Sequence, residues 1–311
     1  MSNNTTNHIV YDGSMTPEMF AEKLAEMRAA VCFDGESVIN PKVTDKVTAC
    51  QTRDASEIQR AGVSGMTARD GILKNFADLF FSNNYGGKVL DIAGLSGFAG
   101  NNRRCIERAR AGFGICSACF SFIRSKFSNL NAWTKNDTIL STVQLKPGSV
   151  IIDPDLVPEM RYSTHGDLIN SLHAYNLIQI AYDNPRTQFT LWTKNHFEYS
   201  TGRARFIADH DGAFPSNLRV IFSATRTDQY FTECQLKALK AAGYNAIFAV
   251  YETWHSQDIA VKSGAFRCVC GRGSCKYHCH FCYDFFENTS AFPADRAAWI
   301  AEIKDGERHK E

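Results

Sequence analysis

Short apolar segments of strand length alternate with helical periodicity from Lys88 onward, and this alternation constrains the fold more than any other feature. Strands that alternate with helices pair in parallel, because each helix carries the chain back to the start of the next strand. The sequence therefore predicts an α/β fold with a parallel sheet. The predicted strands cover residues 89–93, 150–152, 160–163, 189–193, 218–223 and 246–251, and the predicted crossover helices cover residues 168–182 and 232–242.

The segments on either side of this pattern have a different character. Residues 1–87 are expected to be helical and irregular, with one helix starting at Thr16 and a second running from Thr67 to Phe80. We expect a β/α domain over residues 88–260 and a Cys/His-rich segment over residues 261–311. A chain of 311 residues with 44% hydrophobic residues is long enough to bury the core of such a domain.

Composition argues against several classes of protein. The formal net charge of +1 gives no electrostatic case for binding duplex nucleic acid, although a local basic patch is compatible with it. No apolar run reaches the roughly 18 to 20 residues of a membrane span. The first residues carry no basic segment followed by an apolar one. We therefore expect a cytoplasmic protein without a membrane partner, in which the 11 cysteines do not form a framework of disulfides.

The densest group of soft metal ligands lies near the C-terminus. Gly271 and Gly273 allow the chain to fold back, so that two pairs of thiolates can reach one centre. Zinc and a closed auxiliary iron–sulfur cluster are equally compatible with this composition, and the simplest alternative is a structural zinc knuckle. The cysteines of this group are Cys268, Cys270, Cys275, Cys279 and Cys282, interleaved with His278 and His280.

A second group of cysteines follows the first predicted strand. Three thiolates hold three irons of a four-iron, four-sulfur cluster and leave the fourth iron open to a small ligand, whereas structural zinc takes four protein ligands. Cys105, Cys116 and Cys119 therefore predict a cluster with an open position. The alternative is that Cys105 is a buried core residue and that only Cys116 and Cys119 act as a pair.

Polar residues follow four of the predicted strands, at positions 163–167, 193–195, 223–226 and 251–253. The carboxyl ends of parallel strands meet at one edge of the sheet, so these residues are expected to face one cavity. We expect His165 to act as a general base whose ring is held by Asp167. Lys194, Arg226 and Arg161 are candidates to clamp an anionic group of a ligand. The alternatives are helix capping by Asp167, a hydrogen-bonded strand terminus at His165, and solvated surface charges.

These motifs together carry a resemblance to a known family. Over residues 94–282 the chain resembles the gene product 88 family of phage and plasmid proteins, which is similar to radical S-adenosylmethionine enzymes. The resemblance rests on the order of Gly100-Asn101-Asn102, Cys105, Cys116-Ser-Ala-Cys119-Phe120, Arg161-Tyr-Ser-Thr-His-Gly166-Asp167, Phe189-Thr-Leu-Trp-Thr193-Lys194 and the terminal cysteine group.

The resemblance implies a β/α barrel or partial barrel, of phage or mobile-element origin, in the cytoplasm of a host cell. It implies that Cys105, Cys116 and Cys119 hold a four-iron, four-sulfur cluster. It also implies that S-adenosylmethionine binds at the strand ends, through the residues Gly166, Asp167, Lys194 and Arg226.

Cys275, Cys279 and Cys282 also have the three-then-two spacing that radical S-adenosylmethionine enzymes carry. Only residues 283–311 follow them, which is too short a segment to build a barrel downstream. We interpret them as a second centre, completed by Cys268 or Cys270.

Two functions are compatible with these residues. The leading hypothesis is an iron–sulfur protein, with radical S-adenosylmethionine chemistry on an unidentified small-molecule or nucleic-acid substrate as its candidate activity. The alternative is a zinc-stabilised nucleic-acid-binding or regulatory module without catalysis, in which Arg272, Lys276 and His278 contact phosphate.

Overall fold

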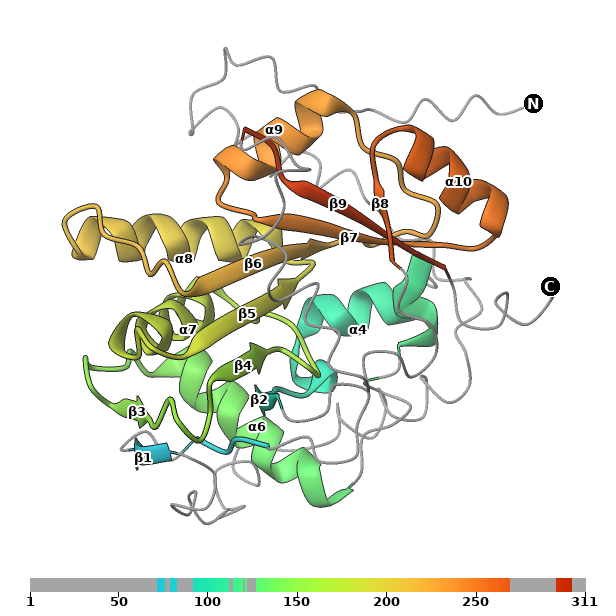
Figure 1. Cartoon of the computed structure of the whole chain (residues 1–311). Helices are drawn as coiled ribbons and strands as arrows, with labels where there is room; N and C mark the ends of the chain where they lie inside the picture. Colours follow the sequence, from blue (N-terminus) through green and yellow to red (C-terminus); the bar gives the residue numbers. More distant parts are fainter. Residues whose placement is uncertain are drawn as a thin grey trace. The chain divides into compact units, whose positions relative to one another are not determined.

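Seven strands form one parallel sheet in the order β2-β4-β5-β6-β7-β9-β8 (Figure 1). The structure is a computed structural model, and it describes residues 72–75, 79–82, 92–111, 114–119, 121, 127–268 and 295–303. Every neighbouring pair of strands in this sheet is parallel, as the sequence predicts. The strands are β2 (Ala93–Leu95), β4 (Glu159–Tyr162), β5 (Gln188–Thr193), β6 (Leu218–Ser223), β7 (Ala246–Tyr251), β9 (Ala298–Ile303) and β8 (Phe266–Arg267).

Four helices that join successive strands cover one face of the sheet. The strand order rises steadily from β2 to β7, and right-handed crossovers then place every connecting helix on the same face. Leu177 packs with Leu191 of β5, and Leu236 packs with Trp299 of β9, both on this face. The helices are α7 (Ser171–Asp183), α8 (His196–Asp209), α9 (Glu233–Ala241) and α10 (Trp254–Lys262).

This winding is the one that β/α barrels use, but the described strands form an open sheet rather than a closed barrel. The strands at its two ends are short, since β2 has 3 residues and β8 has 2. Short edge strands offer few backbone groups for further pairing. A single antiparallel bridge joins Gly94 of β2 to Ser82. The α/β fold with a parallel sheet is confirmed, and closure into a barrel is not.

Two elements before β4 differ from the prediction. Part of the helix expected over residues 67–80 is a strand, β1 (Ile72–Asn75), which pairs antiparallel with β3 (Val150–Ile152) in a separate two-stranded sheet. The prediction of a helix there and of a parallel strand at 150–152 was therefore wrong. A short apolar run fits both periodicities, so its pairing partner decides its conformation. In addition, β2 starts at Ala93, at the end of the strand expected over residues 89–93. Residues 83–91, which include most of that expected strand, lie outside the described residues.

The two predicted crossover helices are confirmed as α7 and α9, with ends set by local capping. Asn170 caps α7 by accepting a hydrogen bond from the backbone N–H of His173, and Thr232 forms a capping box at the start of α9. Gly243, with a φ of 91°, follows α9 in the left-handed conformation that glycine favours. The predicted ends of both helices therefore follow from residues that cap or terminate them.

β9 lies inside the sheet, between β7 and β8. We assigned residues 261–311 to a terminal Cys/His-rich segment, and two pieces of that segment, β8 and β9, are strands of the parallel sheet. Cys270, Cys275, Cys279 and Cys282 belong to the connection between these two strands and lie outside the described residues. The chain therefore passes through the cysteine-rich run and returns to the sheet.

The connection after β2 lies at the carboxyl edge of the sheet. It contains η2 (Ala99–Asn101), α4 (Arg103–Arg110), η3 (Gly114–Ala118) and α6 (Phe127–Thr142). Figure 1 shows α4 beyond the arrowheads of β4 and β5. Among the helices that the structure describes, none has both the length and the apolar character that crossing a bilayer requires.

Candidate functional site

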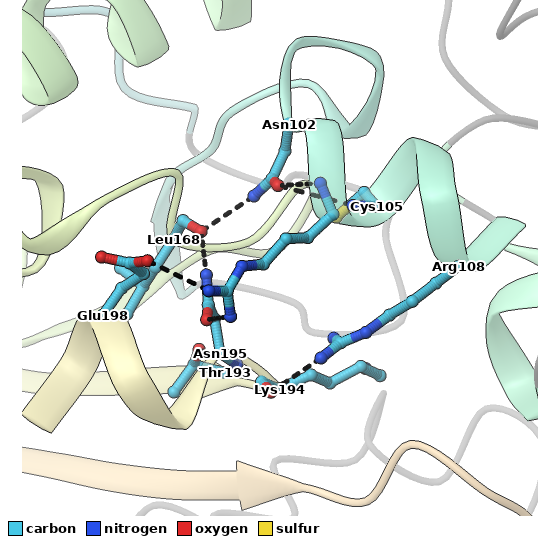
Figure 2. Close-up of polar contacts among 9 residues, drawn as sticks. Asn102, Cys105, Arg108, Leu168, Thr193, Lys194, Asn195 and Glu198 are labelled. Atoms are coloured by element: carbon cyan, nitrogen blue, oxygen red, sulfur yellow. Dashed lines mark hydrogen bonds and ion pairs between the residues drawn. The ribbon is translucent and has the colours of Figure 1, made fainter. Parts of the chain in front are cut away.

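Asn102 fixes the start of α4 to the loop that follows β4 (Figure 2). Its Oδ1 accepts from the backbone N–H groups of Arg104 and Cys105, at 3.0 and 3.4 Å, and so caps the helix. Its Nδ2 donates to the carbonyl oxygens of Asp167 and Leu168, at 3.1 and 2.8 Å. The side chain is 2% exposed. A single buried amide therefore sets the position of the helix that carries Cys105.

Two arginines of α4 reach the loop that follows β5. Arg104 donates to Asn195 Oδ1 at 2.5 Å and lies 3.3 Å from Glu198 Oε1 at the start of α8. Arg108 donates to the carbonyl oxygen of Lys194 at 3.5 Å. Figure 2 shows Arg108 reaching Lys194. The helix thus crosses the ends of β4 and β5 and brings positive charge to this edge of the sheet.

The buried carboxylate of Asp167 joins the loops that follow β4 and β5. Its Oδ1 accepts from Leu168 N at 2.8 Å and from Thr193 Oγ1 at 2.6 Å, and its Oδ2 accepts from Lys194 N at 3.0 Å. Three of the roughly four acceptor positions of a carboxylate are therefore engaged within the protein. Capping of the next helix, the alternative role for Asp167, falls to Asn170 instead.

His165 and Gly166 contact the connection that follows β2. The His165 ring stacks on Trp133 of α6, with ring centroids 4.3 Å apart, and its carbonyl oxygen accepts from Gly97 N at 3.1 Å. Gly166 has a φ of 79°, and a Cβ at this position would lie 3.0 Å from the carbonyl carbon of Gly97. Glycine is required here because two backbone segments approach closely. We expected the Asp167 carboxylate to hold the His165 ring. The ring instead stacks on Trp133, and the carboxylate accepts its hydrogen bonds from residues 168, 193 and 194.

Three cysteines lie where α4 and η3 meet the carboxyl edge. Cys105 belongs to α4, Cys116 belongs to η3, and Cys119 follows it, donating through its backbone N–H to the Cys116 carbonyl at 3.3 Å. Cys105 and Cys119 pack against an apolar cluster that includes Phe98 and Trp133. All three are partly buried thiols.

The thiols influence one another electrostatically. Burial is the main cause that raises the pKa of Cys105 well above its usual value, and the Asp167 carboxylate adds to it. The neighbouring Cys119 and Cys116 raise that pKa further. Burial also raises the pKa of Cys116, whereas the Lys194 ammonium acts in the opposite direction. Loss of several protons from this group is unfavourable unless positive charge compensates for it.

η3 is seated against the loop that follows β6. A Cβ at Gly114, where φ is 52°, would lie 2.2 Å from the carbonyl oxygen of Thr225 and 3.0 Å from the Cα of Arg226. Lys194 donates from Nζ to Ser223 Oγ at 3.0 Å, which joins the ends of β5 and β6. We predicted that Cys105, Cys116 and Cys119 face Asp167, Lys194 and Arg226 at the carboxyl edge. The charges of Asp167 and Lys194 do act on Cys116, whereas the residue that closely approaches Arg226 is Gly114.

Cys268 lies at the other end of the sheet. It follows β8, donates from its backbone N–H to the carbonyl of Ala301 at 2.8 Å, and packs against a buried cluster on the face opposite the connecting helices, which consists of Ile221, Ala246, Ala298 and Ile300. Arg161 lies on the same side, with its guanidinium 4.6 Å from the centre of the Trp192 ring. Arg161, a candidate to clamp an anion, is thus placed on an aromatic ring of β5.

No group of three or more His, Cys, Asp or Glu side chains within the described ranges is arranged to hold a metal ion. Thiols are nevertheless the ligands that iron–sulfur clusters use, and Cys105, Cys116 and Cys119 lie near enough to influence one another electrostatically, with Arg108 and Lys194 acting on Cys116. The thiol positions predicted in the C-terminal run, apart from Cys268, lie outside the described residues.

Asp137 of α6 is a functional candidate that the sequence analysis missed. Its Oδ2 accepts from Phe98 N at 2.8 Å and from Asn101 Nδ2 at 2.9 Å. A Cβ at Gly97 would lie 1.9 Å from its Oδ1, so only glycine fits beside the carboxyl. Burial raises the pKa of Asp137 to about 7. The sequence carries no signal for it, because α6 mixes polar and apolar residues and Asp137 lies between Asn136 and Thr138.

Comparison with protein-family models, with curated proteins and with solved structures finds no match to this chain. The resemblance to the gene product 88 family therefore stays a prediction. The arrangement of the site is what indicates a function.

Proposed function

We propose that this chain is an iron–sulfur protein whose first centre is held by Cys105, Cys116 and Cys119. The observation that carries the proposal is the position of these three thiols in the connection after β2, at the carboxyl edge of a parallel sheet and near enough to one another that Cys119 and Cys116 add to burial in raising the pKa of Cys105. A positive metal centre would offset the mutual repulsion and the burial that now raise the pKa of Cys105 and Cys116. Arg108 and Lys194 favour the anionic form of Cys116 in the same way.

The proposed activity is that of a radical S-adenosylmethionine-like enzyme, acting in the cytoplasm of a host cell. Three cysteine ligands would leave one iron of a four-iron cluster open for S-adenosylmethionine, which on receiving one electron from the reduced cluster would be cleaved to methionine and a radical that takes hydrogen from a substrate; an external reductant would supply that electron. The steady winding of the strands, with the cysteines in the connection after β2, supports this class. Asp167 keeps one acceptor position for a ligand, and Lys194 lies beside it.

Anaerobic reconstitution with iron and sulfide tests the proposal. We expect stoichiometric iron and acid-labile sulfide and the visible absorption of a cluster in the wild type, with the first centre lost in Cys116→Ser and Cys119→Ser. Cys234→Ser is the matched control, because Cys234 is an exposed thiol on α9 and should leave the iron content unchanged. Protein that binds zinc alone without sulfide, or a Cys119→Ser variant with full iron and sulfide content, would contradict the assignment.

Enzymatic activity needs a separate readout. With the cluster reduced, we expect formation of 5′-deoxyadenosine from S-adenosylmethionine in wild-type protein and in Cys234→Ser, and none in Cys119→Ser. An intact cluster that neither binds nor cleaves S-adenosylmethionine would leave an iron–sulfur protein of another class.

The alternative function, a zinc-stabilised nucleic-acid-binding module, has one observation in its favour. α4 carries four arginines, and the side chain of Arg103 is 91% exposed. Two others, Arg104 and Arg108, bond instead to the loop and helix that follow β5. Arg272, Lys276 and His278, the residues expected to contact phosphate, lie outside the described residues. The same metal analysis distinguishes the two functions.

A further inference from the structure

A cavity lies at the amino edge of the sheet, at the opposite ends of the strands from the thiol group. It has a volume of about 230 Å³ and is open to solvent. It lies between α8, the start of β6 and the turn that joins α9 to β7. Its lining includes Arg203, Phe214, Ser216, Lys240, Gly243 and Asn245.

The cavity brings together two cationic side chains that make no ion pair with any carboxylate in the described part of the chain. The basic residues next to them differ: Arg205 pairs with Asp209, and Lys237 pairs with Asp295. Arg203 and Lys240 therefore leave an excess of positive charge in the cavity.

The guanidinium of Arg203 is held in place although one of its donors is unused. It lies over the Phe214 ring at 5.1 Å, and its Nε is buried without a hydrogen-bond partner among the described residues. A Cβ at Gly243 would lie 2.5 Å from this Nε, so the left-handed glycine also leaves the space that the guanidinium occupies. Because Nε is buried toward Gly243, an anion in the cavity would meet the partly exposed end of the Arg203 side chain instead, and the packing on Phe214 and Gly243 holds that side chain in position.

We propose that this cavity binds a small phosphate-type oxyanion, either free phosphate or the phosphate of a small monoester. An arginine fork matches phosphate oxygens, and a lysine ammonium adds a second positive charge. The volume is below the roughly 300 Å³ at which pockets for drug-sized ligands begin, and it exceeds by several-fold the roughly 30 Å³ that one water occupies. The site is separate from the thiol group, so it would regulate or stabilise the protein rather than take part in its chemistry.

Titration calorimetry with the full chain tests the site, using inorganic phosphate in a chloride buffer of constant ionic strength. We expect saturable binding below about 10 mM phosphate, weakened about tenfold or more in Arg203→Gln and in Lys240→Gln. Glycerol phosphate provides the second arm: tighter binding than inorganic phosphate identifies a monoester as the ligand, and equal or weaker binding identifies free phosphate.

Lys262→Gln is the matched control, since Lys262 is an exposed lysine in the last turn of α10, and it should bind phosphate as the wild type does. Arg203 packs against Phe214, so circular dichroism must first show that Arg203→Gln is folded; Lys240→Gln, which changes a partly exposed side chain, carries the test if it is not. An absence of saturable binding by wild-type protein would overturn the proposal. Equal loss in Lys262→Gln and Lys240→Gln would do so as well.

Discussion

At the scale of single residues, burial sets the chemistry around the candidate site. Asp137 is 3% exposed, and desolvation raises its pKa from 3.8 to about 7, although Asn101 and Phe98 donate to it. The folded protein therefore holds a proton at this carboxyl more tightly than the unfolded chain does. The stability that this proton contributes is present at acid pH and is lost as the pH rises from 3.8 to about 7.

Replacing Asp137 with asparagine should remove this pH dependence. An asparagine oxygen still accepts from Phe98 N and Asn101 Nδ2, but it needs no proton. We expect the free energy of unfolding of Asp137→Asn, relative to wild type, to be higher at pH 8 than at pH 5 by on the order of 2 to 3 kcal/mol. Urea unfolding at the two pH values measures it. Asp155→Asn, at an exposed position, is the control, and an Asp137→Asn difference that is equal at both pH values would contradict the assignment.

Residues of this kind mark the limit of prediction from sequence. The cysteines were singled out because closely spaced soft ligands are uncommon outside metal sites. Their shared place at the carboxyl edge of the sheet followed from the positions of the strand ends. Asp137 meets its partner Phe98 across 39 positions of sequence, and Asn102 meets Leu168 across 66. Whether a polar residue is buried or exposed depends on such distant contacts, which spacing within one segment does not reveal.

At the scale of elements, contacts with two loops at the carboxyl edge of the sheet hold α4 in place. Asn102, which precedes the helix, bonds to the loop that follows β4. Arg104 and Arg108 bond to the loop that follows β5. A helix of 8 residues is too short to be stable alone, so these tertiary contacts determine whether it forms. The position of Cys105 depends on the same contacts.

Asn102→Ala should therefore affect both stability and cluster content. It removes a helix cap, which contributes about 1 kcal/mol, and leaves two buried carbonyl groups with one donor fewer. We expect a loss of about 2 to 4 kcal/mol in the free energy of unfolding, together with reduced iron incorporation after anaerobic reconstitution.

Thr232→Ala is the matched control for this variant. It removes the cap of α9 away from the cysteines, and should cost about 1 kcal/mol with no change in iron content. Equal iron content in Asn102→Ala and wild type, despite the loss of stability, would separate α4 from the proposed centre.

The elements predicted best are those in which apolar residues recur at helical spacing and a capping residue marks the start of the helix. α7 and α9 have apolar residues at helical spacing, with Asn170 and Thr232 at their starts. β1 had neither signal, since its four residues lie within a short apolar run compatible with a helix or a strand. Its identity as a strand depends on pairing with β3, which is more than 70 positions away in sequence.

At the scale of the whole molecule, the chain adds strands in one direction and then turns back once. β2 to β7 follow sequence order across the sheet, but β9 enters between β7 and β8. The strand alternation predicted the first part. The return could not be read from the sequence, because only a single short apolar segment follows the cysteine-rich run and its place depends on its neighbours. Any metal centre formed in the run between β8 and β9 would therefore be coupled to the sheet itself.

The central position of β9 gives the last prediction. Trp299 is fully buried in the core between the sheet and the helices, so Trp299→Ala should cost about 3 to 5 kcal/mol. Truncation after residue 296 removes the whole strand, which leaves β7 paired on one side only, with β6, and takes away the strand with which β8 pairs; we expect no cooperative unfolding transition. Truncation after residue 303 removes none of the described residues and should retain the wild-type transition in circular dichroism. A wild-type unfolding midpoint in the chain ending at residue 296 would show that β9 contributes nothing to the sheet's stability.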